Sequence, residues 1–200
     1  MRFGSSLNLL ATIFELSVVR MEVNMPHKKT LIVYGSNKGT TRDMVYEIAK
    51  RLDKPSEFFD CKNCSLQLGN NGKIMKLEQI NLSNYGLILI GTPMYMGAPL
   101  KAVKQFCIQN EAELYSHELG IFTCGVGTQE EDRAYIRKHI PETLIGKAYY
   151  SHLGGEIREN KMNLLERAAM RGFIKQRGSV TGVNHDSLNK LCSFANLNTM

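Results

Sequence analysis

The chain has 200 residues, of which 43% are hydrophobic and 22% charged. These values are typical of a soluble globular protein with one core, and they exclude a disordered, collagen-like or disulfide-framework chain. Lys and Arg outnumber Asp and Glu by 25 to 19, and half of that excess lies in residues 156–177 (six basic, three acidic). This basic segment is either a solvated helix face or a surface for an acidic partner protein, an anionic membrane or nucleic acid.

Residues 1–26 form an N-terminal extension that precedes the first strand signal. Leu7–Val19 is apolar, but it is shorter than a membrane span, and Glu15 would be costly in lipid. No small-x-small cleavage site of a signal peptide follows it. Since Met21 and Met25 lie just before the first strand, the extension is either a loosely held segment or the result of a misassigned start.

The first recognisable unit is a strand, a polar loop and a helix. Lys29–Tyr34 is a nearly continuous apolar run, which is typical of a strand buried on both faces. Residues 36–41 form a small polar loop, and apolar residues at helical spacing then predict a helix over residues 42–52. Thr40 and Asp43 have the spacing of a capping box, and the same spacing recurs in Thr128 with Glu131 and in Asn163 with Glu166, before two later helices.

Later strands alternate with helices along the chain. Strands are predicted at Ser56–Asp60, Leu87–Gly91, Leu119–Thr123 and Ala148–Leu153, and helices from Pro99, from Thr128 toward His139 and from Asn163 to Gln176. Such alternation implies parallel pairing with right-handed crossovers. We therefore expect a three-layer α/β fold, with a five-stranded parallel sheet and helices on both faces, over residues 27–177. Residues 178–200 are predicted to be a polar C-terminal tail that either has no regular structure or forms one short helix.

Ligands of open α/β sheets bind beyond the carboxyl ends of the strands, and three polar or Gly-rich loops lie there, at residues 36–41, 92–97 and 123–128. In the first loop, hydroxyl groups, backbone N–H groups and the positive end of the helix dipole would converge on an anion. Gly39 would let the backbone approach that anion closely. A simple capped turn explains the same residues.

Other phosphate motifs do not fit this loop. Gly35 and Gly39 lack the spacing of a Walker A motif, so nucleoside triphosphate hydrolysis has no support. The dinucleotide pattern GxGxxG is also missing. A phosphoacceptor receiver domain needs acidic residues after the first strand, and Tyr34-Gly35 offers none.

The pattern Ser36-x-x-Gly39-x-Thr41 after a buried strand resembles the phosphate loop of flavodoxins. Gly91–Gly97 is similar to the second flavin loop of that family, and Thr123–Gly127 to the third. Gly154-Gly155 and the helix after it resemble the flavodoxin-like branch that includes menaquinone-dependent protoporphyrinogen dehydrogenase. The resemblance covers about residues 28–176 and supports the fold expected above.

The resemblance implies a site for flavin mononucleotide (FMN). The phosphate would be held by Ser36, Asn37, Lys38, Gly39, Thr40 and Thr41. The ribityl chain and one ring face would be bordered by Thr92, Pro93, Met94, Tyr95, Met96 and Gly97, and the other side of the ring by Thr123, Cys124, Gly125, Val126 and Gly127. Tyr95 is the expected stacking aromatic. Lys38 stands where flavodoxins usually have a hydroxyl, and it either adds a charge to the phosphate site or indicates a remodelled loop.

The cysteines and histidines indicate no metal site. Five cysteines are an odd number, which favours reduced thiols in a cytosolic protein. Cys61 and Cys64 form a CxxC motif without the second pair that structural zinc sites use. The five histidines are dispersed along the chain.

The expected function is that of an FMN-dependent oxidoreductase or electron-transfer protein, in which the flavin carries the redox chemistry and no protein side chain acts as a general base. Menaquinone-dependent protoporphyrinogen oxidation in haem biosynthesis is a more specific alternative. A cofactor-free binding module on the same fold is another. The expected partners are a redox protein or a quinone, not nucleic acid, in the cytoplasm or peripherally at the inner face of an anionic membrane.

Overall fold

The computed structural model describes residues 29–63, 65–68, 80–156, 159–177 and 182–199. Its strands are β1 (Lys29–Tyr34), β2 (Ser56–Asp60), β3 (Ser65–Leu68), β4 (Tyr85–Tyr95), β5 (Ala98–Pro99), β6 (Glu118–Cys124), β7 (Tyr149–His152), β8 (Gly154–Gly155) and β9 (Gly182–Val183). Its helices are α2 (Thr40–Ala49), α3 (Lys101–Gln109), α4 (Glu111–Tyr115), α5 (Gln129–Ile136), α6 (Glu142–Lys147), α7 (Leu164–Arg177) and α8 (His185–Leu197), with 3₁₀ turns η3 (Leu82–Asn84) and η4 (Glu159–Lys161). The expected N-terminal extension and Cys64 lie outside the described residues.

The main sheet has five parallel strands in the order β2-β1-β4-β6-β7. Two short strands extend it in the antiparallel sense, β3 on the edge strand β2 and β5 on β4. The chain runs outward from β1 to β2 and then crosses back to β4 on the other side of β1, so the switch point of the topology lies between β1 and β4. The predicted three-layer α/β fold is confirmed.

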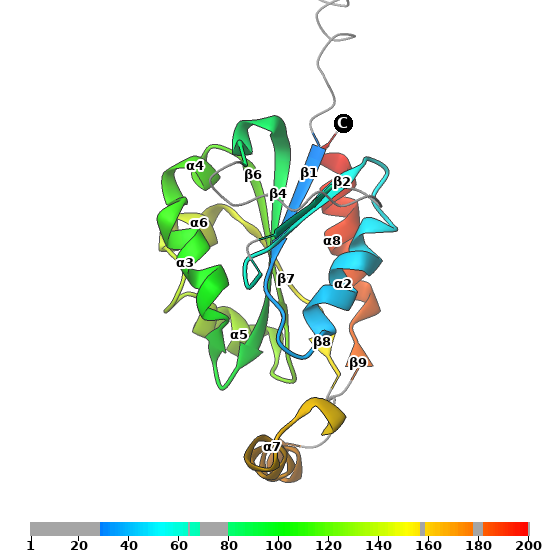
Figure 1. Ribbon diagram of the computed structural model, residues 1–200, viewed down its shortest axis with the longest axis vertical. Coiled ribbons are helices and arrows are strands. Elements are labelled where there is room, and N and C mark those ends of the chain that lie inside the picture. Colours follow the sequence, from blue (N-terminus) through cyan, green and yellow to red (C-terminus); the bar gives the residue numbers. More distant parts are fainter. Residues whose placement is uncertain (1–28, 64, 69–79, 157–158, 178–181, 200) are drawn as a thin grey trace, which may run out of the picture.

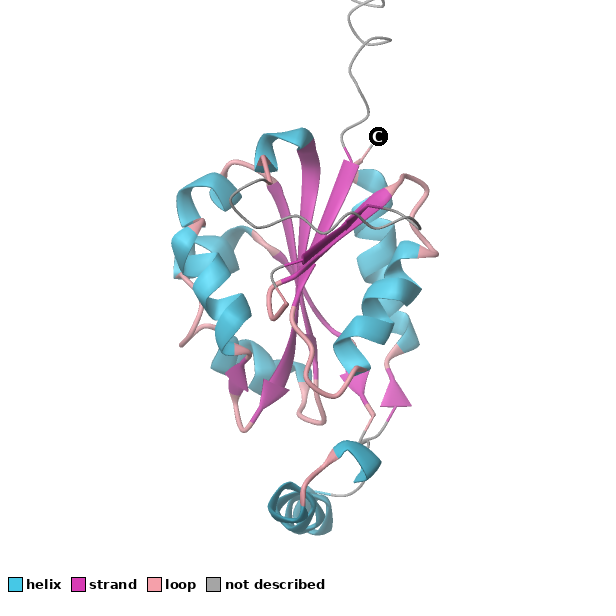
Figure 2. Ribbon diagram, viewed as in Figure 1, coloured by secondary structure: helices cyan, strands magenta, loops and turns pink. Residues whose placement is uncertain are grey.

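Helices cover both faces of this sheet (Figures 1 and 2). Helices α2 and α8 pack on one face, and α3, α4, α5 and α6 on the other. Alternate residues of β1 point to the two cores: Leu31 and Val33 to the α3–α6 side, Ile32 and Tyr34 to the α2–α8 side. Because both faces of the central strands are buried, β1, β4 and β6 are mostly apolar.

The two antiparallel strands were not predicted from the sequence. Residues 92–97 were expected to be a loop, but Thr92–Tyr95 continue β4, and the chain reverses in the two-residue turn Met96-Gly97. Pro99 was expected at a helix start, but it belongs to β5, and α3 begins at Lys101. A hairpin this short has no alternation pattern by which it could be recognised.

The C-terminal part also differs from the expectation. Residues 178–200 were predicted to be a polar tail, but α8 packs on the sheet and buries Leu188, Leu191, Cys192 and Ala195. The helix predicted at Asn163 to Gln176 forms as α7, yet it does not close the domain. It lies beyond the carboxyl ends of the strands, at the lower end of Figure 1, with Leu164 and Leu165 each 83% exposed. The short pair β8–β9 marks where the chain leaves and rejoins the domain.

Candidate functional site

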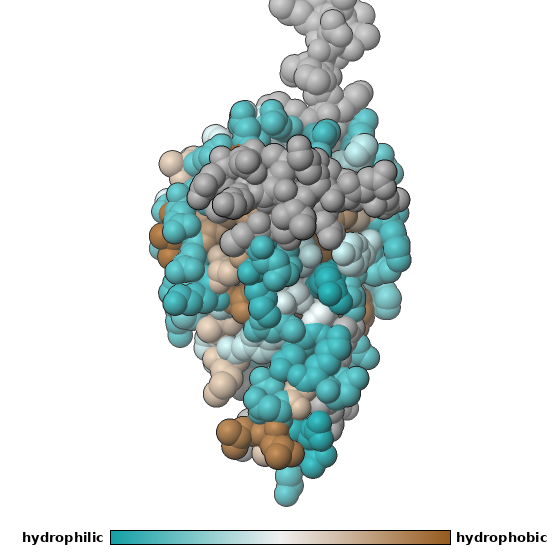
Figure 3. All heavy atoms as spheres, in the orientation of Figure 1, coloured by the Kyte–Doolittle hydropathy of each residue, from teal (hydrophilic) through white to brown (hydrophobic). Residues whose placement is uncertain are grey.

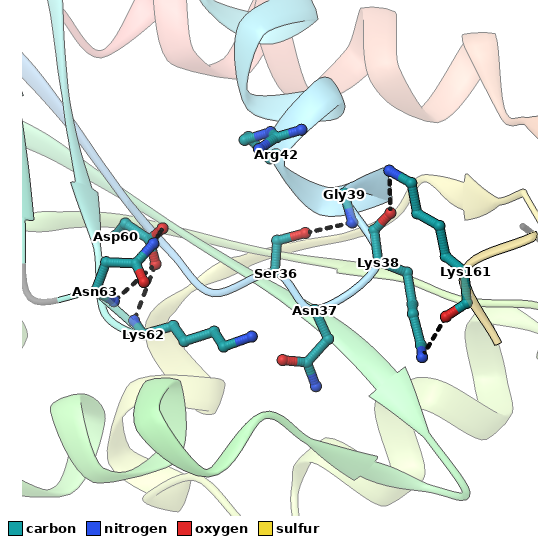
Figure 4. A pocket seen from close by; sticks show the side chains of 9 residues that line it. All are labelled: Ser36, Asn37, Lys38, Gly39, Arg42, Asp60, Lys62, Asn63 and Lys161. Carbon is teal, nitrogen blue, oxygen red and sulfur yellow. Dashed lines mark hydrogen bonds between the residues drawn. The ribbon is translucent and has the colours of Figure 1, made fainter. Parts of the chain in front are cut away.

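A depression of about 240 Å³ lies at the carboxyl end of β1 (Figure 4). Three segments form it: the β1–α2 turn, the turn after β2, and η4. Its lining residues are Ser36, Asn37, Lys38, Gly39, Arg42, Asp60, Lys62, Asn63 and Lys161. The depression therefore lies next to the switch point, where open α/β sheets bind their ligands.

The β1–α2 turn has the geometry of an anion site. Gly39 is the N-cap of α2 and has a φ of 97°, a conformation that residues with a Cβ rarely adopt. Its N–H donates to Ser36 Oγ (3.1 Å), and the first bond within the helix runs from Asp43 N to Gly39 O (2.9 Å). The N–H groups of Thr40 and Thr41 precede that first bond, at the positive end of the helix dipole.

The capping box predicted for Thr40 and Asp43 is wrong. Thr40 is the first helical residue, and Gly39, which caps the helix, has no side chain to accept a hydrogen bond. The predicted boxes at the other two helices are confirmed. Thr128 and Glu131 bond each other's backbone N–H groups at α5, and Asn163 and Glu166 do so before α7.

Cationic side chains surround the depression. Arg42 comes from the first turn of α2, Lys62 from the turn after β2, and Lys161 from η4. Asp60 accepts hydrogen bonds from Lys62 N (2.9 Å) and Asn63 Nδ2 (2.6 Å), which fixes the shape of its turn. Sequence reasoning missed Arg42, Asp60, Lys62, Asn63 and Lys161. Only Arg42 carried a signal, because it follows the loop directly.

The Lys38 side chain points away from the helix start and toward α7. Its Nζ donates to Lys161 O (2.7 Å) and to Glu166 (2.8 Å), and Lys161 Nζ donates back to Lys38 O (3.1 Å). Figure 4 shows the reciprocal pair of Lys38 and Lys161. Of the two interpretations that the sequence left open, this geometry favours a remodelled loop. The Lys38 contacts tie the β1–α2 turn to the segment that leads into α7.

The second predicted segment splits into buried and exposed residues. Thr92 and Pro93 are buried, and Thr92 Oγ1 accepts from Leu100 N (2.9 Å), so this hydroxyl supports the chain rather than facing the depression. At the tip of the hairpin, Met96 and Gly97 have positive φ values of 50° and 78°. A type I′ turn requires positive φ values at both of its central residues. Because Met96 has a Cβ, its positive φ implies backbone strain, and its side chain is fully exposed.

Tyr95 bridges from this hairpin to the β1–α2 turn. Burial raises the pKa of its phenol, and a hydrogen bond with the Lys38 backbone opposes that rise. The ring remains 37% exposed. On the other side of the hairpin, a Cβ on Gly97 would meet the Tyr135 ring at 3.0 Å, so α5 supports the tip. Sequence reasoning missed Tyr135, because nothing in a helical pattern shows that its ring meets a hairpin.

The third predicted segment follows β6 and lies against the second. A Cβ on Gly125 would be 3.3 Å from Met94 Cβ, and Gly125 N donates to Gly154 O (3.1 Å). Thr123 and Cys124 are buried. Burial raises the pKa of the Cys124 thiol to about 12, so it is a neutral core group at physiological pH. Gly125, Val126 and Gly127 are therefore the part of this segment at the surface.

These residues fit a phosphorylated, planar ligand. Thr41 Oγ1 is buried at the start of α2 and has no oxygen or nitrogen partner among the described residues, with only the Cys124 thiol beside it. A hydroxyl without a partner at a helix N-terminus has the character of an anion ligand. The backbone N–H groups at the start of α2 and the cations Arg42, Lys62 and Lys161 would attract a phosphate, beside the single carboxylate of Asp60 in the lining, and Tyr95 offers a partly exposed aromatic face.

The chain matches the family model described as a flavodoxin domain over residues 31–183. The match spans most of the sheet and its helices, and the chain belongs to this family. The resemblance noted in the sequence is thus confirmed for the family. Nothing in the match singles out the protoporphyrinogen dehydrogenase branch.

Solved structures match this chain at low identity. A flavoprotein from Lactobacillus acidophilus in complex with FMN is 24% identical, over 64% of this chain and 93% of its own, with a TM-score of 0.42. Rubredoxin oxygen:oxidoreductase from Desulfovibrio gigas is 15% identical, over 94% of this chain and 41% of its own (TM-score 0.49). A WrbA-like flavodoxin from Agrobacterium tumefaciens is 17% identical, over 74% and 98% (TM-score 0.43).

The search of curated proteins gave no match. Within the described ranges, none of the helices combines the length and the apolar character that crossing a bilayer requires.

Proposed function

We propose that the chain binds FMN at the carboxyl end of β1 and β4 and serves as an electron-transfer flavoprotein. The observation that carries the proposal is the depression at the start of α2, which Ser36, the N-cap Gly39 and the cations Arg42, Lys62 and Lys161 line. The buried Thr41 hydroxyl lies in the first turn of the same helix and has no oxygen or nitrogen partner among the described residues. Family membership supports it, since flavodoxin domains are the fold in which such a site is expected.

Each of the three segments would have its own task. Ser36, Asn37 and the N–H groups that open α2 would hold the phosphate, with Thr41 as a further ligand. Tyr95 would lie along one face of the isoalloxazine ring, and residues 125–127 would border its edge, where Gly125 and Gly127 have no side chain and permit close approach. Bound FMN would supply one- and two-electron redox chemistry, and the chain would position it and exclude water.

A visible spectrum of the purified protein, followed by titration of the apoprotein with FMN, tests the proposal. We expect the flavin band at about 450 nm, bleaching with dithionite. Riboflavin, which lacks the phosphate, is the matched control ligand, and we expect it to bind at least about a hundredfold more weakly, because hydrogen bonds to charged groups are worth roughly 1.5–3 kcal/mol each. A colourless protein that takes up no FMN would refute the proposal and favour the cofactor-free binding module.

A more specific proposal is that the flavin passes electrons to a membrane quinone, as in menaquinone-dependent protoporphyrinogen oxidation. The exposed Leu164 and Leu165 of α7 favour it, because they form an apolar surface at the end of the molecule where the site opens (Figure 3). The exposed Lys161 and Lys175 add positive charge to the same segment, which suits an anionic membrane surface.

Porphyrin fluorescence after protoporphyrinogen and menaquinone are supplied to the FMN-loaded protein tests the reaction. Sedimentation with phosphatidylglycerol vesicles tests the membrane contact, with phosphatidylcholine vesicles as the control. Replacing Leu164 and Leu165 by Ser should abolish sedimentation while FMN binding persists. If no porphyrin formed above the protein-free control, the proposal of protoporphyrinogen oxidation would be refuted, and electron transfer to another partner would remain.

A further inference from the structure

Residues 159–177, which comprise η4 and α7, form an arm that lies beyond the carboxyl ends of the strands (Figure 1). The chain leaves the domain at β8 and rejoins it at β9, and these two strands pair with each other. Leu164 and Leu165, in the first turn of α7, are each 83% exposed. Because these apolar side chains are not packed against the sheet, polar contacts help to fix the position of this end of the arm.

Hydrogen bonds join the arm to the β1–α2 turn. Lys161 Nζ donates to Lys38 O (3.1 Å), and Lys38 Nζ donates to Lys161 O (2.7 Å) and to Glu166 Oε2 (2.8 Å). The same Glu166 oxygen accepts from Asn163 N (2.9 Å), so the carboxylate that caps α7 also binds Lys38. These contacts lie at the surface, where ion pairs and hydrogen bonds stabilise a structure only slightly. In the apoprotein they therefore hold the arm weakly.

Lys161 belongs to the arm and also lines the depression proposed to hold the FMN phosphate (Figure 4). Its ammonium group donates to an uncharged group, the Lys38 carbonyl. Arg42 and Lys62 line the same depression, and the lining contains a single carboxylate, that of Asp60. Like charges that share a site repel one another, and a phosphate dianion between them replaces this repulsion by attraction. Lys161 is the cation that the arm contributes to this site.

The β1–α2 turn also contacts Tyr95, the residue proposed to lie along the flavin ring. A hydrogen bond joins the Tyr95 phenol to the Lys38 backbone. Burial raises the pKa of this phenol, and the Glu166 charge adds to the rise, so the carboxylate of the arm lies close to this side chain. Lys38 therefore connects the phosphate turn, the β4–β5 hairpin and the arm. A ligand that occupies both the depression and the face of Tyr95 would contact all three.

We propose that Lys161 binds the FMN phosphate and that FMN thereby fastens the arm to the domain. The inference rests on the proposed function. A ligand that contacts the arm only in its attached position stabilises that position, and by linkage the attached arm raises FMN affinity by the same factor. Leu164 and Leu165 are then fixed beside the cofactor only in the FMN-loaded protein, so a partner that binds them there meets a loaded flavin site.

Hydrogen exchange of the backbone amides in residues 159–166 tests the coupling, measured without ligand, with saturating FMN and with saturating riboflavin, which lacks the phosphate. We expect FMN to slow this exchange roughly tenfold or more and riboflavin to leave it near the rate of the apoprotein. Lys161→Met keeps the aliphatic stem and removes the charge, and Lys175→Met changes an exposed lysine elsewhere on α7. Lys161→Met should bind FMN roughly ten- to a hundredfold more weakly and lose the slowing, whereas Lys175→Met should behave as wild type.

If FMN bound to the wild type without slowing exchange in the arm, the coupling would be overturned and FMN binding would stand. Equal FMN affinities of Lys161→Met and Lys175→Met would likewise overturn the role of Lys161 alone. Equal slowing by riboflavin and FMN would show that the ring, not the phosphate, holds the arm, which contradicts the proposal. A wild type that bound no FMN would refute the proposed function, and the coupling would fall with it.

Discussion

Replacing Thr41 by Val should move the stability of the apoprotein and its affinity for FMN in opposite directions. Val has nearly the shape of Thr and the same β-branch, so the change removes little more than the hydroxyl. In the folded apoprotein this hydroxyl is buried and, among the described residues, has only a thiol beside it. With FMN bound, we expect the hydroxyl to bond a charged phosphate oxygen.

The magnitudes follow from those two environments. A buried polar group without a good partner costs about 1–3 kcal/mol, and the weak thiol contact of Thr41 Oγ1 places this site at the lower end. The apoprotein should therefore gain about 1 kcal/mol, a rise in Tm of roughly 2–4 °C. Loss of a hydrogen bond to a charged group costs about 1.5–3 kcal/mol, so FMN should bind roughly ten- to a hundredfold more weakly.

Thr30 offers a matched control. Its hydroxyl is also buried and without a partner among the described residues, but it lies at the opposite end of β1. Thr30→Val should stabilise the apoprotein by a similar amount and leave FMN affinity unchanged. Calorimetry of the apoproteins and fluorescence titration with FMN measure the two quantities. If Thr41→Val bound FMN as tightly as Thr30→Val does, the assignment of the phosphate site to the start of α2 would be refuted.

Two further predictions concern packing and the α7 attachment. Gly91→Ala would place a Cβ 2.2 Å from Cζ of the buried Phe122 ring and should destabilise the protein by about 1–3 kcal/mol, measured by urea denaturation. Gly146→Ala, where a Cβ meets no described atom within 4 Å, should not destabilise it. Equal denaturation midpoints for the two variants would contradict this packing. The hydrogen bond from Lys38 lowers the pKa of Glu166, so this tie is present above the ordinary carboxyl pKa and is lost as the pH falls through the lowered value. Hydrogen exchange of the backbone amides at the start of α7, corrected for intrinsic rates, should be faster in Glu166→Gln than in wild type at neutral pH. In acid the two proteins should exchange at the same rate. Equal rates at neutral pH would show that Lys38 does not hold the helix.

The main sheet could be predicted from local sequence. The strands at residues 29–34 and 87–91 read as apolar runs because burial on both faces leaves few polar positions. The strand at residues 56–60 gave a weaker signal, because its burial alternates between intermediate and full. Two of the three capping boxes were also correct, since a capping box depends on two side chains three residues apart. The third failed because the φ of Gly39 moved the start of the helix, and spacing alone does not report a dihedral angle.

Helices α7 and α8 show where local pattern fails. Both are amphipathic, and the sequence predicts that the first closes the domain and the second belongs to a tail. The structure reverses these roles, because Leu188 and Leu191 find a free sheet face beside α2, whereas Leu164 and Leu165 do not. The apolar face of a helix makes its burial favourable, but the rest of the fold decides which surface covers that face.

By itself, the sequence determined the α/β class, the resemblance to the family and the β1–α2 turn at one edge of the sheet, because each of these depends on residues close together in the chain. Only the tertiary structure brought Arg42, Lys62 and Lys161 around one depression and placed Asp132 against His152. The physical reason is that charges and hydrogen bonds act over a few ångströms in space. The residues they join come from separate strands and turns, and the chain brings them together only when it folds.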